Sequence, residues 1–192
     1  MVLGLKSGTV ELFGHDPEWG ANAADTIKKL RDIFGPVVKD IQHVGSTSIR
    51  HIKAKPVIDI AVSAWNFEDV LALTPVLEEN GFIFRGWEGE EDRQPRFQCG
   101  KYNAENDAMH TLTHYIHIVM ANSQNWHNYI NFRDYMNAFP SAAFKYEALK
   151  LRLAKEIKDD GNYLNYHPGK QSYVKEMIET ANLWDRSGRN VR

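Results

Sequence analysis

A glycine–serine turn at Gly45, Ser46 and Thr47 is the first feature of this sequence whose residue types could do chemistry. Glycine has no Cβ, so a ligand can approach the backbone closely, and the two hydroxyl groups can donate to it. A helix that begins at such a turn directs free N–H groups toward an anion. The turn therefore predicts phosphate contacts from Gly45, Ser46 and Thr47. The alternative is that the hydroxyl groups only cap a helix.

A carboxylate inside an aliphatic run is the second such feature. Asp59 lies between Ile58 and Ile60, in a run of β-branched residues that predicts a central strand. Burying a carboxylate without a partner costs folding free energy. Asp59 therefore lies at a solvent-exposed end of the strand, pairs with a base such as Lys55, or binds a ligand. A rigid strand aspartate suits a hard divalent cation, Mg²⁺ or Mn²⁺, which would neutralise phosphate charge. Asp59 is therefore a candidate catalytic residue and metal ligand.

These two features together resemble a known family. The strings HVGSTSI at 43–49 and AKPVIDI at 54–60 are similar to the GrpB family, within the polymerase-β-type nucleotidyltransferase superfamily. The likeness continues along nearly the whole chain, in DPEW at 16–19, IHIV at 116–119, FRDY at 132–135, YEALK at 146–150, and Lys170 with Tyr173. The resemblance implies binding of a nucleoside triphosphate, or another phosphorylated small molecule, with a divalent metal. It also implies nucleotidyl transfer to an acceptor that the sequence does not name.

One position departs from the superfamily pattern. Nucleotidyltransferases of this type usually carry two carboxylates on one strand, one residue apart, and the second position here is Ala61. A methyl group cannot ligate a cation, so a two-metal site of the usual kind is missing its second ligand. The alternative function is a catalytically degenerate module that binds a nucleotide or a phosphorylated metabolite. A purely structural partner domain is a third possibility.

His117 is the candidate that could stand in for the missing carboxylate. It lies between Ile116 and Ile118 on an expected strand, so its side chain faces opposite to theirs. Its imidazole could join Asp59 at a metal or act as a general base, and imidazole favours transition metals. The alternative is a structural, hydrogen-bonded histidine. His114, three residues away, is expected on the other face, so a histidine cluster is not predicted.

Basic side chains would complete a phosphate site. Lys55 flanks both motifs, Arg96 lies at an expected strand end, and Arg133, by resemblance, turns from a C-terminal helix toward the cleft. For Arg96, taken alone, a solvated surface position is the competing interpretation. Cys99, the single cysteine, is interpreted as a small structural hydrophobe and excludes an intrachain disulfide.

The elements that position these residues are strands first and helices last, which predicts an α+β (α/β) fold. We expect one domain over residues 1–192, with a strand-rich core at about 9–120 and a helical part at about 126–186. By resemblance this is a nucleotidyltransferase-like mixed β-sheet flanked by helices. The expected strands are 9–13, 37–44, 56–62, 82–85, 96–98 and 113–120, and the expected helices are 17–34, 67–80 (divided at Pro75), and three after residue 126.

Composition narrows the class of protein further. The 192 residues are 43% hydrophobic and 25% charged, which is ordinary for a globular chain and disfavours disorder. A formal net charge of −2 gives no global field toward nucleic acid. No apolar run is long enough for a membrane span and no secretory signal is visible, so the expected location is the cytoplasm.

Overall fold

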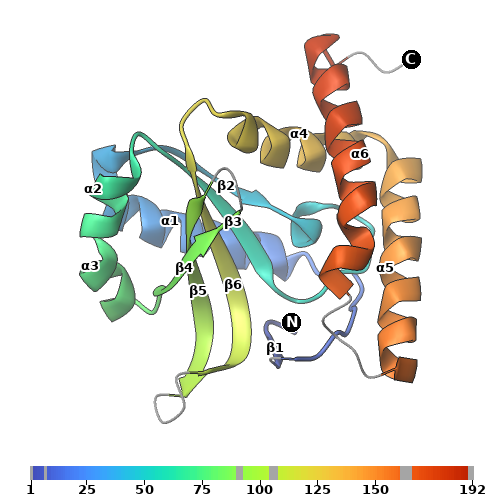
Figure 1. Ribbon diagram of the computed structural model, residues 1–192, viewed down its shortest axis with the longest axis horizontal. Coiled ribbons are helices and arrows are strands. Elements are labelled where there is room, and N and C mark those ends of the chain that lie inside the picture. Colours follow the sequence, from blue (N-terminus) through green and yellow to red (C-terminus); the bar gives the residue numbers. More distant parts are fainter. Residues whose placement is uncertain (1, 7, 90–92, 104–107, 161–165, 190–192) are drawn as a thin grey trace.

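The computed structural model describes residues 2–6, 8–89, 93–103, 108–160 and 166–189. Figure 1 shows a mixed β-sheet with helices packed around it, which confirms the predicted α+β class. The strands are β1 (Leu5–Lys6), β2 (Val38–Val44), β3 (Ile58–Ala64), β4 (Ile83–Glu88), β5 (Gln94–Asn103) and β6 (Ala108–Met120). The helices are α1 (Glu18–Phe34), α2 (Phe67–Ala72), α3 (Thr74–Glu79), α4 (Gln124–Ala138), α5 (Pro140–Asp160) and α6 (Tyr166–Arg186).

The sheet has the strand order β2-β3-β6-β5-β4, and β1 pairs with β6. The β3–β6 pair is parallel, whereas β2 with β3, β5 with β6, and β4 with β5 are antiparallel. In the parallel register Asp59 lies opposite Tyr115, and Ala61 lies opposite His117. The topology therefore places the predicted carboxylate strand directly beside the predicted histidine strand.

One face of the sheet is buried under α1. Alternate residues of β3 (Ile58, Ile60 and Val62) are fully buried and form one cluster with Leu30 and Phe34 of α1. Because side chains alternate along a strand, the opposite face of β3 carries Asp59, Ala61 and Ser63. The hydrophobic pattern thus fixes which face is left for the functional side chains.

Helix α4 packs against β2, β3 and β6, and α5 and α6 pack against α4 beside the sheet (Figure 1). Phe132 and Met136 of α4 and Tyr146 of α5 pack with Ile49 and Ile52, in the segment that follows the Gly45 turn. Ser123 caps α4, because its hydroxyl accepts a hydrogen bond from the Trp126 N–H at 3.2 Å.

Three hydrogen bonds that these helices donate to backbone carbonyls help to tie them to the same segment. Arg133 Nη1 donates to the His43 carbonyl, Asn137 Nδ2 donates to the Ser48 carbonyl, and Lys150 Nζ donates to the Lys53 carbonyl. Residues 43–53, which contain the glycine–serine turn, are therefore braced from the helical part of the chain.

The predicted edge strand at 9–13 is wrong. Only Phe13 pairs, through an isolated bridge with Ala54, and the first strand is Leu5–Lys6. The physical reason is that Val10 and Leu12 pack against the cluster between α5 and α6 instead of entering the sheet. None of the helices in the described part of the chain combines the length and apolar composition that a membrane crossing requires.

Candidate functional site

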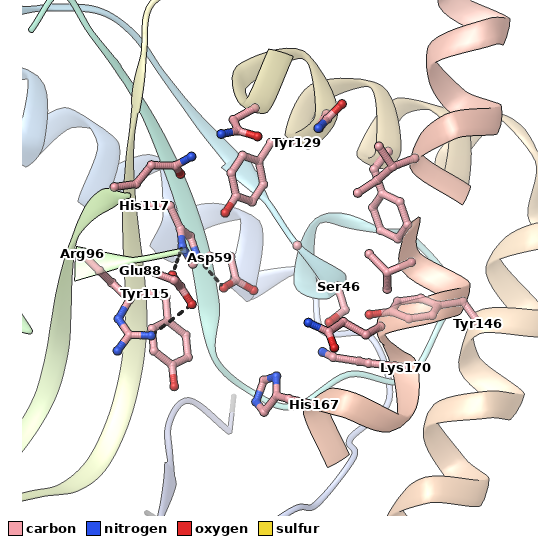
Figure 2. A pocket seen from close by; sticks show the side chains of 18 of the residues that line it. Ser46, Asp59, Glu88, Arg96, Tyr115, His117, Tyr129, Tyr146, His167 and Lys170 are labelled. Carbon is pink, nitrogen blue, oxygen red and sulfur yellow. Dashed lines mark hydrogen bonds and ion pairs between the residues drawn. The ribbon is translucent and has the colours of Figure 1, made fainter. Parts of the chain in front are cut away.

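Asp59 and His117 meet on the open face of the sheet, as the strand pattern predicted. The His117 Nε2 atom lies 3.1 Å from Asp59 Oδ1, and Figure 2 shows the two side chains pointing toward each other. His114 faces the other way, with its Nε2 3.2 Å from the Thr26 hydroxyl of α1. The expected separation of the two histidines is confirmed.

A second carboxylate, Glu88, contacts the other ring nitrogen of His117. Its Oε2 lies 3.4 Å from His117 Nδ1, and its Oε1 accepts from Arg96 Nη1 at 3.1 Å. The Arg96 guanidinium also lies over the Tyr115 ring, 5.7 Å from its centroid. His117 is therefore held between Asp59 and Glu88, and Arg96 balances part of the charge of Glu88 (Figure 2).

The protonation of this cluster follows from its partners. Burial alone would lower the pKa of His117, but the hydrogen bonds and charges of Asp59 and Glu88 outweigh it and raise that pKa to about 9. The same contact with His117 lowers the pKa of Glu88. With that pKa the imidazole is charged at neutral pH and both of its N–H groups donate to carboxylates, whereas ligation of a metal or action as a general base, the two roles considered from the sequence, requires a neutral imidazole.

Gly45 is the residue that lets the serine turn approach Asp59. Its φ is +68°, and a Cβ added there would lie 2.2 Å from Asp59 Oδ2 and 2.7 Å from Asp59 Cβ. No other residue type fits without displacing the aspartate. Ser46 follows at the start of a short 3₁₀ helix, Ser46–Ser48, and lines the same cavity as Asp59.

A cavity of about 730 Å³ opens over these residues. The sheet supplies the ionisable cluster at its floor, and α4, α5 and α6 supply largely aromatic and aliphatic walls. A cavity of this size and lining suits a small molecule. Its lining comprises Gly45, Ser46, Asp59, Glu88, Gln94, Arg96, Tyr115, His117, Asn125, Asn128, Tyr129, Phe132, Tyr146, His167, Pro168, Lys170, Gln171, Val174 and Ile178.

The end of the cavity near the start of α6 is basic. Lys170 lines it beside Ser46 (Figure 2), and Lys55 Nζ lies 3.4 Å from His167 Nε2. Both lysines also lie over the Tyr166 ring, 5.2 and 5.3 Å from its centroid. No carboxylate of the described residues lies within ion-pair distance of Lys55 or Lys170.

Electrostatics make this basic end unfavourable without an anion. Burial and the charge of Lys170 lower the pKa of Lys55 to about 8, and burial lowers the pKa of Lys170. Lys150, behind them, is fully buried over Tyr146, and burial with the neighbouring lysines lowers its pKa to about 7. Cationic side chains with depressed pKa values, and with no carboxylate at ion-pair distance in the part of the chain that the structure describes, mark a place where a bound anion would be stabilised.

The residues do not fit a resident metal centre. Within the described ranges, no group of three or more histidine, cysteine, aspartate or glutamate side chains is arranged to hold a metal ion. Both ring nitrogens of His117 face carboxylates, and Ala61 offers no donor. Asp59 Oδ2, the oxygen turned toward Gly45, is the one carboxylate atom of the cluster that makes no contact with His117 or Arg96.

Three predicted phosphate contacts, Thr47, Arg133 and Lys55, lie outside the cavity lining. Thr47 is buried, with its hydroxyl 2.9 Å from His43 Nε2, so it supports the turn from behind. Arg133 donates to Gln42 and to the His43 carbonyl and pairs with Asp134, so it braces β2 instead of reaching the cleft. Lys55 stands next to the lining residue His167. The predicted residues Gly45, Ser46, Asp59, Arg96 and His117 do line one cavity.

Sequence reasoning missed Glu88 and the groups that α4 and α6 contribute. Glu88 lies between the expected strands 82–85 and 96–98, whereas β4 runs to that residue and pairs it with Gln94 beyond a register shift. Lys170 enters the sequence-based prediction only through the family resemblance. The spacing of basic residues along α6 carries no signal by itself, because most such residues on helices are solvated.

The comparison with protein families decides the identity of the fold. A family model described as "GrpB protein" matches residues 9–180. The chain belongs to the GrpB family. Among curated relatives, the "Glutamate-rich protein GrpB" of Alkalihalophilus pseudofirmus is 34% identical over 178 residues, 92% of this chain and 98% of that protein. The "UPF0157 protein YqkA" of Bacillus subtilis is 31% identical over 181 residues, which are 94% of this chain. This chain spans about half (49%) of the length of YqkA.

Solved structures agree with the GrpB assignment. The crystal structure of the conserved protein GrpB from Enterococcus faecalis matches with a TM-score of 0.76 and 26% identity, covering 89% of this chain and 96% of that one. Cid1 in complex with its short product ApU matches with a TM-score of 0.50 and 14% identity, covering 74% of this chain and 42% of Cid1. The second likeness is one of fold, which is nucleotidyltransferase-like.

Proposed function

We propose that the cavity binds a nucleotide or another phosphorylated small molecule, with its phosphates at the basic end beside Ser46 and Lys170. The observation that carries this proposal is that Lys170, at the end of a cavity large enough for such a ligand, and Lys55 beside it have no carboxylate within ion-pair distance among the described residues. Phosphate oxygens would accept from the ammonium groups, from the Ser46 hydroxyl and from N–H groups of the turn. Binding would restore ordinary pKa values to the lysines.

Asp59 makes the proposal depend on a cation. A phosphate near Ser46 would be repelled by the carboxylate of Asp59 unless a positive charge lay between them. Magnesium is commonly held by one or two carboxylates together with substrate phosphates, and Asp59 Oδ2 can supply one such oxygen. We therefore expect Mg²⁺ or Mn²⁺ to enter with the phosphates, as part of a metal–nucleotide complex.

Nucleotidyl transfer to an acceptor is the second candidate. It is favoured by the placement of Asp59 Oδ2 against the Gly45 turn in a nucleotidyltransferase-like fold, one member of which, Cid1, was solved with the dinucleotide product ApU. Ala61 stands against it, because the second carboxylate of the usual pair is missing. Binding without turnover is therefore the first candidate.

Calorimetric titration with the four nucleoside triphosphates and with inorganic tripolyphosphate, in Mg²⁺, in Mn²⁺ and in EDTA, tests the proposal. Lys170→Gln should weaken binding at least about tenfold, since it removes a charged donor to phosphate. Lys175→Gln is the matched control, because Lys175 is exposed on the same helix and does not line the cavity. Failure of every phosphorylated probe to bind the wild-type protein would refute the proposal.

Asp59→Asn separates the two candidates. It should remove the advantage of Mg²⁺ or Mn²⁺ over EDTA, because the amide no longer attracts the cation. Pyrophosphate release by the wild-type protein with a nucleoside triphosphate, abolished in Asp59→Asn, would favour transfer. Binding without any release in either metal would favour the binding module.

A further inference from the structure

A chain of side-chain amides links α4 to α6 at the end of the cavity away from the lysines. Asn131 Nδ2 donates to Asn182 Oδ1 at 2.9 Å, and Asn182 Nδ2 donates to Asn128 Oδ1 at 2.8 Å. Gln124 Nε2 donates to the same Asn128 oxygen at 2.9 Å. Asn131 is buried, so this chain is anchored in the interior and ends at the cavity lining residue Asn128.

The chain fixes what Asn128 can offer a ligand. An amide oxygen has two lone pairs, and both of those on Asn128 Oδ1 receive hydrogen bonds from Gln124 and Asn182. The amide nitrogen, which can donate two hydrogen bonds, has no acceptor among the described residues, and because Asn128 lines the cavity its donors are available to a ligand there. Asn128 therefore presents donors without a competing acceptor, and its rotamer is held in place before any ligand arrives.

The walls around this end suit a flat, largely apolar group. Tyr129 and Phe132 of α4 and Val174 and Ile178 of α6 line the cavity here. Tyr129 also faces His117, with ring centroids 5.3 Å apart (Figure 2). A flat ring can pack against the Tyr129 phenol or slide between the aliphatic side chains, and a single donor on the wall would set its orientation.

The distance between the two ends matches a nucleotide. Lys170 and Ile178 both line the cavity from α6, and eight residues of helix span about 12 Å. A nucleoside carrying two or three phosphates can bridge that separation, whereas a free phosphate cannot reach both ends. The cavity thus has one end for anions and one end for a ring.

We propose that Asn128 is a specificity residue that recognises the nucleobase of the ligand. Its side-chain amide donates a hydrogen bond to an acceptor on the base, either a ring carbonyl or a ring nitrogen. The inference rests on the proposed function, since it names the group at the far end of the same ligand. Gln124 and Asn182 are positioning residues, because they act only through Asn128.

Asn128→Asp tests the inference with the least change in shape. Aspartate keeps an oxygen to accept from Gln124 and Asn182, but it faces the cavity with a second oxygen in place of the donor. The matched control is Asn66→Asp, which adds the same charge at the cap of α2, outside the cavity lining, and gives up only the hydrogen bond from the Asn66 amide to Asp69. Calorimetric affinities are measured for nucleoside triphosphates, for inorganic tripolyphosphate and for unphosphorylated nucleosides.

Relative to Asn66→Asp, we expect Asn128→Asp to weaken the binding of nucleoside triphosphates at least about tenfold. The binding of tripolyphosphate should weaken less than about twofold. Equal losses for both kinds of probe, or no loss for either, would overturn the inference. In a third outcome, tripolyphosphate does not bind the wild-type protein, whereas nucleosides bind it and Asn128→Asp abolishes that binding. The phosphate proposal then fails and the role of Asn128 stands. If no probe binds the wild-type protein, both are overturned.

Discussion

Replacing Gly45 with alanine should destabilise the protein in two separable ways. The backbone at Gly45 has φ +68° and ψ −170°, a region that costs a residue with a Cβ on the order of 1–3 kcal/mol. The new Cβ would also lie 2.2 Å from Asp59 Oδ2 and 2.7 Å from Asp59 Cβ. Asp59 is fixed on a central strand, so its carboxylate must turn away and lose its contact with His117. A hydrogen bond between charged groups contributes roughly 1.5–3 kcal/mol.

Gly35→Ala isolates the second effect. Gly35 also has a positive φ, +51° with ψ −126°, but a Cβ there would meet no atom within 4 Å. Gly45→Ala should therefore be less stable than Gly35→Ala by roughly 2 kcal/mol, which for a chain of this size is about 4–8 °C in melting temperature. Thermal and urea unfolding followed by circular dichroism measure both variants. Equal melting temperatures for the two variants would refute the claim that Gly45 is needed for the approach to Asp59.

Three further predictions concern the buried ionisable groups. Burial holds the pKa of Lys150 at about 7, below its unfolded value, so the free energy of unfolding should rise between about pH 7 and 10. Measured by urea unfolding, the wild type should gain about 2 kcal/mol over Lys150→Met between about pH 7 and pH 9. Parallel pH profiles would contradict this. For His117, Asp59 and Glu88 outweigh burial and raise the pKa to about 9, so its stabilising effect is complete below about pH 6.5 and disappears as the pH passes about 9. The wild type should then exceed His117→Gln by roughly 2 kcal/mol at pH 6 and much less above pH 9, and an advantage that grows with pH would show that the imidazole is not held as a cation. Burial raises the pKa of Cys99 to about 12, so iodoacetamide should alkylate it at least about 100-fold more slowly in the native protein than in urea; comparable rates would contradict its interior role.

Much of the scaffold could be predicted because its signals are local. Helix α1 ends at the predicted Gly35–Pro36, and Pro75 divides α2 from α3, since both breaks depend on single residues. The β3 strand is central, as its run of β-branched residues indicated. The failure at 9–13 is different in kind, because the same alternating pattern serves a strand or an extended segment laid on a helix cluster.

In the site, too, residues placed by a local pattern could be predicted, whereas residues placed by tertiary packing could not. Asp59 and His117 were paired correctly, because strand alternation sets which face a side chain occupies. Glu88 was missed because its position depends on a register shift between β4 and β5 at Gly86, whose φ is +83°, and the expected strand ended before that glycine, at residue 85. Arg133 was placed at the cleft by family resemblance, but its guanidinium finds nearer acceptors on β2. Long polar side chains can reach several partners, and only tertiary packing selects among them.

The hydrogen bonds that the helical part donates to the carbonyls of residues 43–53 have a consequence for how the chain can be divided. A fragment that stops after β6 would keep every strand of the sheet, yet it would lack Arg133, Asn137 and Lys150, which hold the carbonyls of His43, Ser48 and Lys53. The serine turn would then lose its support while the sheet around it stayed paired. Supplying residues 123–192 as a separate peptide should restore the turn, so ligand binding would become a reporter of fragment complementation.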